Sequence, residues 1–200
     1  AGAEVVKQTD NPKLSGLLYP ILQALDEQYL DVDAQFGGVD QRKIFMFARE
    51  FLPIIGYSKR IHLMSPLIGG LQAGEKMSAS DVNSKIDILD DEKTVRKKLN
   101  KGFCEEGNTK ENWFLDFSRL VMFPQLYDEK KSFIINRSEK FGGPLTYTSY
   151  EDLVLAFEKK DLHPADLKLC VIDYINALLE PIRKASEKEN ITTLVIDAYE

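Results

Sequence analysis

The chain has 200 residues and a net charge of −6, with 44% hydrophobic and 29% charged residues. This balance is that of a globular protein with a sizeable core. No apolar run reaches the roughly 18 residues of a membrane span, and the negative charge argues against a protein that coats nucleic acid non-specifically. We therefore expect a globular protein with no membrane partner.

The cysteine and histidine content argues against a disulfide-bonded or metal-binding protein. Cys104 and Cys170 are far apart and each has apolar neighbours, so both are expected to be reduced core residues. Two histidines are too few for a His/Cys metal cluster. We expect a cytoplasmic protein without a disulfide framework or a metal site.

The first long helix is predicted from Ser15, its expected cap, to about Tyr29. Leu18, Leu22 and Leu25 share one face with Tyr29, and this stripe is expected to face the core.

A second face of the same helix holds Tyr19, Gln23 and Asp26, at positions i, i+4 and i+7. Three hydrogen-bonding groups beside an apolar face are able to line a small polar pocket. Ordinary exposed polarity is the alternative, and the spacing alone slightly favours it.

The next segment favours a parallel sheet. A strand pattern over 31–36 runs into Gly37 and Gly38, a helix follows, and residues 59–64 form another strand pattern that contains His62. Strand, glycines and helix allow a ligand to approach the backbone at the carboxyl edge of a parallel sheet. Asp40 at the helix start either caps the helix or accepts from ribose hydroxyls. His62 is expected to be a strand or core residue.

Residues 69–80 form a glycine-rich loop that presents Lys76 among Ser78 and Ser80, and an amphipathic helix is expected from Asp81. A flexible cation with hydroxyl groups suits a leaving polyphosphate. A plain surface loop is the alternative.

The remaining chain is predicted to be mainly helical. One helix carries basic residues on one side, another spans 113–121 and ends at Pro124, and a long helix begins at His163. Strands at 132–136 and 145–148 are expected to form a hairpin. The basic side consists of Lys93, Arg96, Lys97, Lys98 and Lys101, and a solvated helix surface is its simplest interpretation.

Three motifs in order identify a resemblance: Ser-Gly-Leu-Leu-Tyr-Pro with a following Gln and Asp, then Gln-Phe-Gly-Gly-Val-Asp-Gln-Arg, then Lys-Met-Ser-Ala-Ser. Together they resemble the second half of a tyrosyl-tRNA synthetase of the eukaryotic and archaeal type, a class I aminoacyl-tRNA synthetase, along essentially the whole chain. The resemblance implies an α/β fold. Residues 1–80 would be the C-terminal part of a Rossmann-like parallel-sheet catalytic domain, and 81–200 a mainly helical anticodon-binding domain.

The resemblance implies roles in tyrosine binding. Asp26 would accept the hydrogen bond of the substrate hydroxyl from within a buried pocket. Tyr19, Gln23 and Gln41 would hold the amino-acid end, with Gln35 supporting the pocket behind them.

It also implies a nucleotide site. Gly38 and Asp40 would lie against the ribose of the adenylate, and Lys76 with Ser78 and Ser80 would close on ATP and stabilise the departing pyrophosphate. ATP would come with Mg²⁺ as a substrate, without a tightly bound cofactor or a metal site in the protein.

In the second domain, Phe141, His163 and Asp166 match positions that meet the first anticodon base of tRNA(Tyr). An aromatic ring stacks on an unstacked base, and a carboxylate accepts from the Watson–Crick edge of guanine. The alternatives are a core role for Phe141 and a capping role for Asp166.

Other partners are implied more weakly. Lys97, Lys98 and Lys101 are candidates for tRNA phosphate contacts on charge alone. The family forms homodimers, so a homodimer is expected of an intact enzyme.

The class I His-containing signature and a further substrate-contacting tyrosine are not found in the chain. We therefore expect the chain alone to be inactive, with one half of its parallel sheet exposed. Two other hypotheses stand: a non-catalytic tRNA-binding or signalling fragment, and the related tryptophanyl enzyme. An acceptor for a phenol hydroxyl argues against the last, because indole has no such group.

The lysine of the loop gives a first prediction. Charge-assisted contacts contribute roughly 1.5–3 kcal/mol each, so Lys76→Ala should lower adenylate formation about ten- to a hundredfold in a chain completed by the missing half. ATP–pyrophosphate exchange measures this rate. An unchanged rate would show that the lysine does not meet the pyrophosphate.

Overall fold

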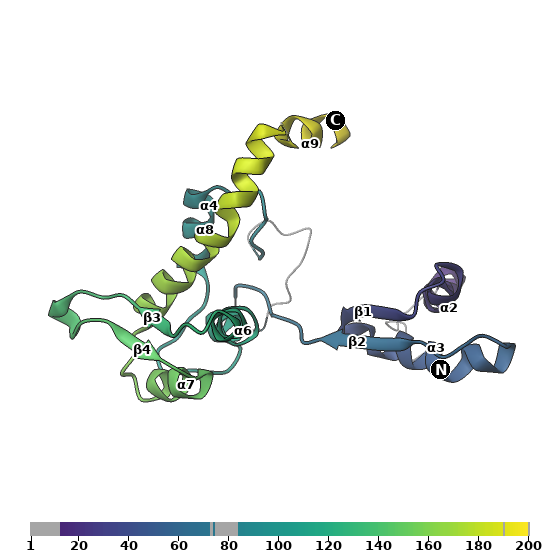
Figure 1. The fold of residues 1–200 in the computed structure, drawn as a ribbon, viewed down its shortest axis with the longest axis horizontal. Coiled ribbons are helices and arrows are strands. Elements are labelled where there is room, and N and C mark those ends of the chain that lie inside the picture. Colours follow the sequence, from purple (N-terminus) through teal and green to yellow (C-terminus); the bar gives the residue numbers. More distant parts are fainter. Residues whose placement is uncertain (1–12, 73, 75–83, 190, 200) are drawn as a thin grey trace. The chain divides into compact units, whose positions relative to one another are not determined.

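The structure, a computed structural model, describes residues 13–72, 74, 84–189 and 191–199. Lys76, Ser78 and Ser80 of the predicted lysine loop lie outside the described residues. The chain forms two compact units, Ala1–Leu67 and Ile68–Glu200. This division by contacts falls before the glycine-rich loop, whereas the expected functional boundary falls after it, and that boundary stays a prediction. The two units are described separately (Figure 1).

The first unit is an α/β unit built around two parallel strands. Gln35 lies opposite His62 in the register, and the connection between the strands contains a helix, as predicted for a parallel sheet. Its elements are α2 (Leu14–Tyr29), β1 (Ala34–Gly38), a 3₁₀ turn (Val39–Gln41), α3 (Arg42–Phe51), a 3₁₀ turn (Leu52–Ile55) and β2 (Ile61–Ser65).

Helix α2 ends where predicted, but two expectations about it are wrong. Ser15 lies inside the first turn, and Lys13 precedes the helix without a side-chain cap. The buried face consists of Pro20, Ala24 and Glu27, while Leu22 is 62% exposed. The predicted leucine stripe does share one face of the helix. However, α3 and the strands cover the adjacent face, which carries Pro20, Ala24 and Glu27.

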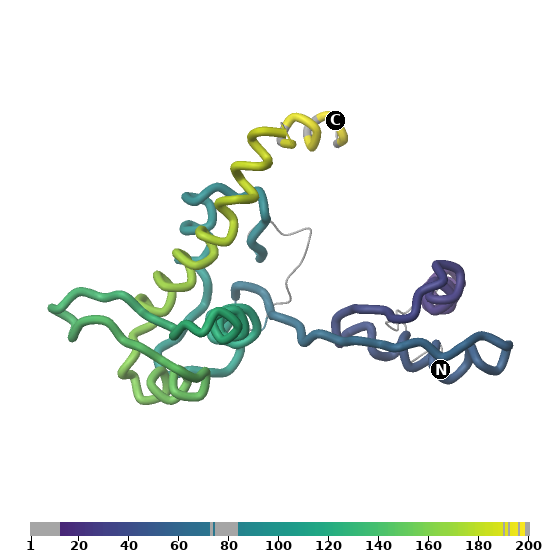
Figure 2. The backbone as a smooth tube through the Cα atoms, in the orientation of Figure 1, coloured from purple at the N-terminus to yellow at the C-terminus, as the bar shows by residue number. Residues whose placement is uncertain are grey.

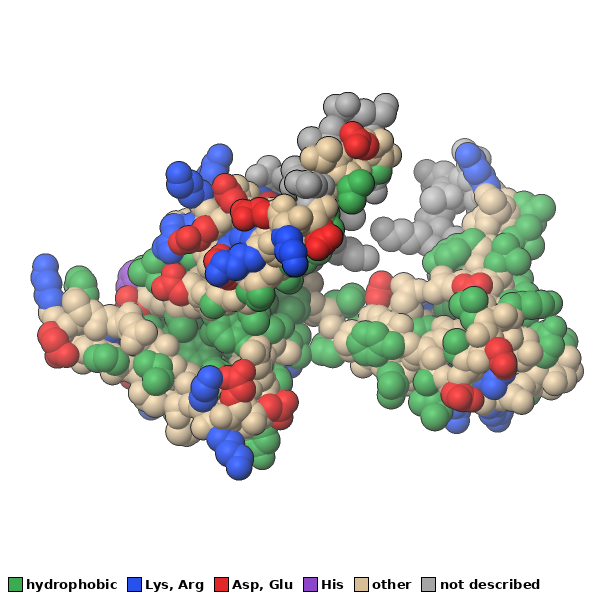
Figure 3. All heavy atoms as spheres, turned by 45° about the horizontal axis from the view of Figure 1, so that its top comes forward, with side chains coloured by type: hydrophobic (Ala, Val, Ile, Leu, Met, Phe, Trp, Pro, Cys, Tyr) green, Lys and Arg blue, Asp and Glu red, His purple; other side chains and the backbone are tan. Residues whose placement is uncertain are grey.

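One face of the strand pair is uncovered in this unit. Phe36 is 75% exposed and Ile61 60%, whereas Gln35 and His62, which alternate with them, are covered. Figure 3 shows hydrophobic side chains gathered on the outside of this unit. Parallel sheets are normally covered on both faces, and the described residues of this unit leave one face of the strand pair open.

The second unit is mainly helical, with one antiparallel hairpin in which Phe133 lies opposite Tyr147. The predicted hairpin and the start of the long helix after His163 are confirmed. Its elements are α4 (Glu92–Lys101), α5 (Trp113–Phe117), a π-helical turn (Ser118–Met122), α6 (Phe123–Asp128), β3 (Phe133–Ile135), a 3₁₀ turn (Glu139–Phe141), β4 (Leu145–Tyr147), α7 (Tyr150–Glu158), α8 (Pro164–Lys188) and α9 (Ile191–Tyr199).

Two helix boundaries differ from the prediction. The first described helix after the glycine-rich loop begins at Glu92, because Asp91 caps it by accepting a hydrogen bond from the Thr94 backbone N–H. Pro124 does not end a helix but lies in the first turn of α6, where its missing N–H is tolerated.

The core of the second unit forms between α4, α5, α8 and the hairpin. Trp113 and Phe114 of α5 are buried, and so are Leu167 and Val171 of α8. Ile182, in the C-terminal part of α8, is 40% exposed, because that part of the helix extends beyond the core (Figure 1).

Polar contacts join α4 to α8 and to the loop before α4. Lys168 donates to the carbonyls of Gly102 and Asn100, at 2.6 and 3.0 Å, so it satisfies groups at the carboxyl end of α4. Lys98 forms a 2.6 Å ion pair with Asp90, and the two side chains are 6% and 12% exposed.

This buried pair gives a stability prediction. Removing one partner of a buried pair leaves an unpaired charge, so Lys98→Ala should lower the free energy of unfolding by about 3 kcal/mol. Lys97→Ala, on an exposed neighbour, is the matched control and should stay within about 0.5 kcal/mol. Urea unfolding followed by the fluorescence of Trp113, which belongs to this unit, measures both. Equal midpoints would contradict the prediction.

Candidate functional site

The polar face of α2 is formed as predicted. Tyr19, Gln23 and Asp26 lie on one continuous helix, so their spacing places them on one side of it. Gln23 is half-buried, whereas Tyr19 and Asp26 are exposed. The expectation of a buried Asp26 is therefore wrong for this chain, because the described residues do not cover this side of α2.

Gln23 and Gln41 are brought together across 18 positions of sequence. Gln23 Nε2 donates to Gln41 Oε1 at 2.8 Å, and Gln41 Nε2 donates to Asp40 Oδ2 at 3.1 Å. Gln41 lies in the turn directly after β1. The two bonds therefore place the polar face of α2 at the carboxyl end of the parallel strands, where ligands bind in open α/β sheets.

The backbone at the end of β1 has no room for a side chain at Gly38. A Cβ there would overlap Asp40 Oδ1 and lie 2.8 Å from Leu67 Cδ2. The structure thus puts the two candidate ribose-binding residues against each other. Asp40 accepts from Gln41 and makes no side-chain cap of α3 among the described residues, so capping does not account for its place.

Gln35 is not bonded to Gln23 or Gln41 but to Glu27, a residue that was not predicted from the sequence. Its Nε2 donates to Glu27 Oε2 at 3.2 Å, and His62 Nε2 lies 2.8 Å from the same oxygen. His62 is a buried strand residue, as predicted, and stacks on Phe45 at 4.9 Å. The available signal was that Pro20, Ala24 and Glu27 also follow helical spacing.

The described start of the glycine-rich loop is anchored in the second unit. Leu71 is buried, its carbonyl accepts from the Phe103 N–H at 2.7 Å, and Gln72 donates to the Lys101 carbonyl at 3.1 Å. A hollow of about 360 Å³ lies beside it, lined by Gly69, Gly70, Gln72, Gly74, Glu111, Trp113 and Asp116. The loop that leads to Lys76 therefore starts from a fixed point.

Phe141 is not a core residue. It is 63% exposed, in the turn between β3 and β4, which projects from the rest of this unit (Figure 2). Gly142 and Gly143 have φ of 93° and 73°, values that favour glycine. Arg137 Nε donates to the Gly143 carbonyl at 2.6 Å and holds the turn. The ring is thus presented to solvent by an ordered turn.

Asp166 is not the cap of α8. His163 takes that position, and its Nδ1 accepts from the Ala165 N–H at 3.1 Å. Nδ1 is then the unprotonated nitrogen, so Nε2–H of the exposed ring is left to donate. The half-buried Asp166 carboxylate in the first turn of α8 keeps its acceptor capacity. The structure therefore contradicts a core role for Phe141 and an N-cap role for Asp166, and the RNA role of both residues stays a prediction.

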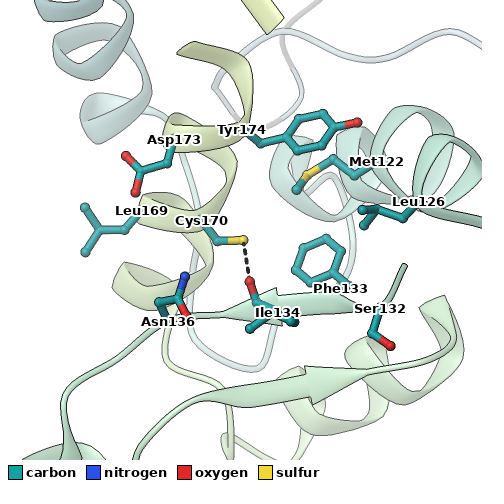
Figure 4. A pocket seen from close by; sticks show the side chains of 10 residues that line it. All are labelled: Met122, Leu126, Ser132, Phe133, Ile134, Asn136, Leu169, Cys170, Asp173 and Tyr174. Atoms are coloured by element: carbon teal, nitrogen blue, oxygen red, sulfur yellow. Dashed lines mark hydrogen bonds between the residues drawn. The ribbon is translucent and has the colours of Figure 1, made fainter. Parts of the chain in front are cut away.

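Strand β3 of the hairpin lies beside the first turns of α8 (Figure 4). The Cys170 thiol donates to the Ile134 carbonyl at 3.5 Å, and a hollow of about 260 Å³ lies between β3 and α8. In Figure 4, Asn136 lies at the end of β3 near Leu169, while Ser132 lies at the opposite end. β3 therefore leads toward the first turn of α8, and the turn with Phe141 follows on that side. Burial raises the pKa of the Cys170 thiol to about 12.

The basic side of α4 is smaller than predicted. Lys98 is buried against Asp90, and Arg96 pairs with Asp173 of α8 at 3.1 Å. Lys98 is therefore wrong as a candidate for phosphate contact, because its ammonium group is not at the surface. Lys97 and Lys101 are exposed, and their proposed contact with RNA stays a prediction.

Among the described residues, no group of three or more His, Cys, Asp or Glu side chains is arranged to hold a metal ion. No helix in the described ranges is long and apolar enough to cross a membrane.

Comparison with known proteins gives a family match. The family model of "tRNA synthetases class I (W and Y)" matches residues 2–180. The cytoplasmic tyrosine–tRNA ligase of Saccharomyces cerevisiae is 57% identical over 195 residues, which cover 94% of this chain and 50% of that protein. The cytoplasmic tyrosine–tRNA ligase of Xenopus tropicalis is 56% identical over 199 residues, which cover 100% of this chain and 37% of that protein.

A solved structure agrees with these matches. Tyrosyl-tRNA synthetase from Archaeoglobus fulgidus, complexed with L-tyrosine, is similar with a TM-score of 0.78 and 41% identity, over 90% of this chain and 55% of that one. The resemblance inferred from the motifs and the α/β fold class are confirmed. The chain spans half or less of the length of the two curated relatives.

Proposed function

The chain belongs to the class I tRNA synthetases of the tryptophan and tyrosine family, and we propose from this premise that it is part of a tyrosine–tRNA ligase. In the proposed reaction the tyrosine carboxylate attacks the α-phosphate of ATP, which gives tyrosyl-adenylate and releases pyrophosphate, and the tyrosyl group is then transferred to tRNA(Tyr), with release of AMP, for protein synthesis. In this proposal the first unit holds the C-terminal half of the active site, and the second unit binds the anticodon.

The observation that carries the proposal is the 2.8 Å bond between Gln23 and Gln41. It brings a helix face with a phenol, an amide and a carboxylate to the carboxyl end of parallel strands. Tyr19, Gln23 and Gln41 would hold the amino-acid end of tyrosine, and Asp26 would accept from its hydroxyl. Tryptophan has no such hydroxyl, so Asp26 favours tyrosine over the tryptophan-specific alternative.

The proposed chemistry needs few proton-transfer groups. Attack of a carboxylate on the α-phosphate of ATP requires alignment and stabilisation of charge on the leaving pyrophosphate. Gly38 and Asp40 would position the ribose, and Lys76 with Ser78 and Ser80 would meet the pyrophosphate. Mg²⁺ would arrive with ATP, and no tightly bound cofactor is required.

The proposed specificity against phenylalanine follows from hydrogen bonding. Once the rest of the enzyme covers the exposed side of α2, Asp26 would be desolvated. Phenylalanine would then leave the carboxylate without a donor, and an unsatisfied buried charge is more costly than a lost contact. The intact ligase is proposed to be a cytoplasmic homodimer.

The test is ATP–pyrophosphate exchange on this chain and on a chimera in which it replaces the matching residues of the Saccharomyces cerevisiae relative. The chimera should exchange with tyrosine, and the chain alone should not, because one face of its strand pair is open. Exchange by the chain alone would contradict the need for another half. Exchange with tryptophan but not tyrosine would establish the tryptophan-specific alternative. A chimera that binds tRNA(Tyr) without exchange would support the non-catalytic alternative.

The anticodon role has its own test. Asp166→Ala should raise the KM for tRNA(Tyr) in aminoacylation about tenfold, the size of one charged hydrogen bond, and leave pyrophosphate exchange within about twofold. Phe141→Ala should act in the same way through lost base stacking of about 1–3 kcal/mol.

Glu151→Ala, at an exposed carboxylate of α7, is the matched control and should change neither rate. An equal loss of exchange and aminoacylation in Asp166→Ala would mean that the residue is structural.

A further inference from the structure

Glu27 is a charged residue inside the first unit. Its side chain is 1% exposed, and that of its partner His62 is 2% exposed. Carboxylates are rarely buried this fully unless they are paired, because water solvates the charged form far better than the protein interior does. The residue therefore requires an explanation beyond packing.

One oxygen of Glu27 connects three elements. Gln35 Nε2 on β1 and His62 Nε2 on β2 both approach Oε2 on α2, at 3.2 and 2.8 Å. Gln35 and His62 are direct neighbours in the parallel register. Both strands therefore meet the helix at a single oxygen: Gln35 Nε2 donates to it, and His62 Nε2 donates to it in the tautomer that is protonated at Nε2.

A fourth element supports the same point. The Phe45 ring of α3 stacks on His62 at 4.9 Å, with an angle of 12° between the ring planes. The same ring leaves little room at Gly37, where a Cβ would lie 3.0 Å from Phe45 Cζ. The glycine, the aromatic ring and the imidazole thus hold the pair between β1, β2 and α3.

The buried Glu27–His62 pair is not explained by a contribution to stability alone. Among the described residues, Glu27 Oε1 and His62 Nδ1 are buried without hydrogen-bond partners. An unsatisfied buried polar atom is destabilising, and apolar residues of similar volume often replace a buried ion pair without loss of stability. Unlike an apolar pair, a hydrogen-bonded pair fixes the orientation of its side chains and of the helix that carries one of them.

The orientation of α2 decides where the side chains of the candidate tyrosine site point. Neighbouring residues on a helix are about 100° apart, so fixing Glu27 inward sets the direction in which Asp26 points. Gln23 is one turn before Glu27 and is fixed by Gln41. The helix is held at two successive turns, and Gln23 and Asp26, two of the residues that would touch tyrosine, lie on and between them.

We propose that Glu27, through its shared bonds with Gln35 and His62, is a positioning residue that sets how α2 presents Asp26 and Gln23 to tyrosine. This inference rests on the proposed function. Glu27 touches neither substrate nor ATP; it acts through the orientation of its helix. An error of about 1 Å in such a position is able to lower a rate a hundredfold.

The test compares stability with the KM for tyrosine and for ATP in the chimera described above. The double variant Glu27→Met, His62→Leu keeps the buried volume and removes both polar groups. It should unfold at the parent temperature or above it, while the KM for tyrosine rises at least tenfold and the KM for ATP stays within about twofold. Glu27→Gln keeps an acceptor for both donors and should stay within about threefold of the parent in every constant.

Glu50→Ala, an exposed carboxylate on α3, is the matched control and should change no constant. A folded double variant with an unchanged KM for tyrosine would overturn the inference, and so would an equal rise of both KM values. If the double variant does not fold, Glu27→Asp decides: it keeps the charge but is too short to reach both strands. A tenfold rise in its KM for tyrosine supports the inference, and an unchanged KM overturns it.

The exchange activity of the parent chimera distinguishes a failure of the positioning role from a failure of the proposed ligase function. Tyrosine-dependent exchange by the parent, together with unchanged variants, would refute the positioning role and leave the proposed function intact. A parent without tyrosine-dependent exchange would overturn both.

Discussion

The first unit depends on the burial of one carboxylate against two parallel strands. Its apolar core is small: the buried cluster consists of Ala24, Ile44, Ala48 and Leu52. Hydrophobic contacts of this kind have no preferred direction. The bonds from Gln35 and His62 to Glu27 do have a direction. They determine which side of α2 meets the sheet, and the polar side that would bind a ligand follows from that choice.

The second unit is built in the opposite way. A continuous apolar core holds α4, α5, α7, α8 and the hairpin together, and its polar groups act at the ends of elements. His163 caps α8 and Lys168 satisfies the last carbonyls of α4. Such a frame presents side chains on rigid supports, as the exposed Phe141 and the first turn of α8 illustrate. This difference between the units supports the proposal that the first would align small substrates and the second would read RNA.

Much of the fold follows from local sequence signals, because caps, turns and alternation act over a few residues. The hairpin, the start of α8 and the polar face of α2 were predicted in this way. The buried face of α2 was not, since periodicity tells which residues share a face but not which face is covered. The pairing of Lys98 with Asp90 and the place of Glu27 depend on contacts from other segments, which the spacing of residues does not reveal.

The central claim is that α2 presents Asp26 to the hydroxyl of tyrosine at the carboxyl end of β1. A crystal structure of the chimera with bound tyrosine tests this claim most directly. The account predicts a phenol oxygen within about 2.6–3.2 Å of an Asp26 carboxylate oxygen, with the amino-acid end at Gln23 and Gln41. Tyrosine bound with its hydroxyl away from Asp26, or on another face of the unit, would contradict it.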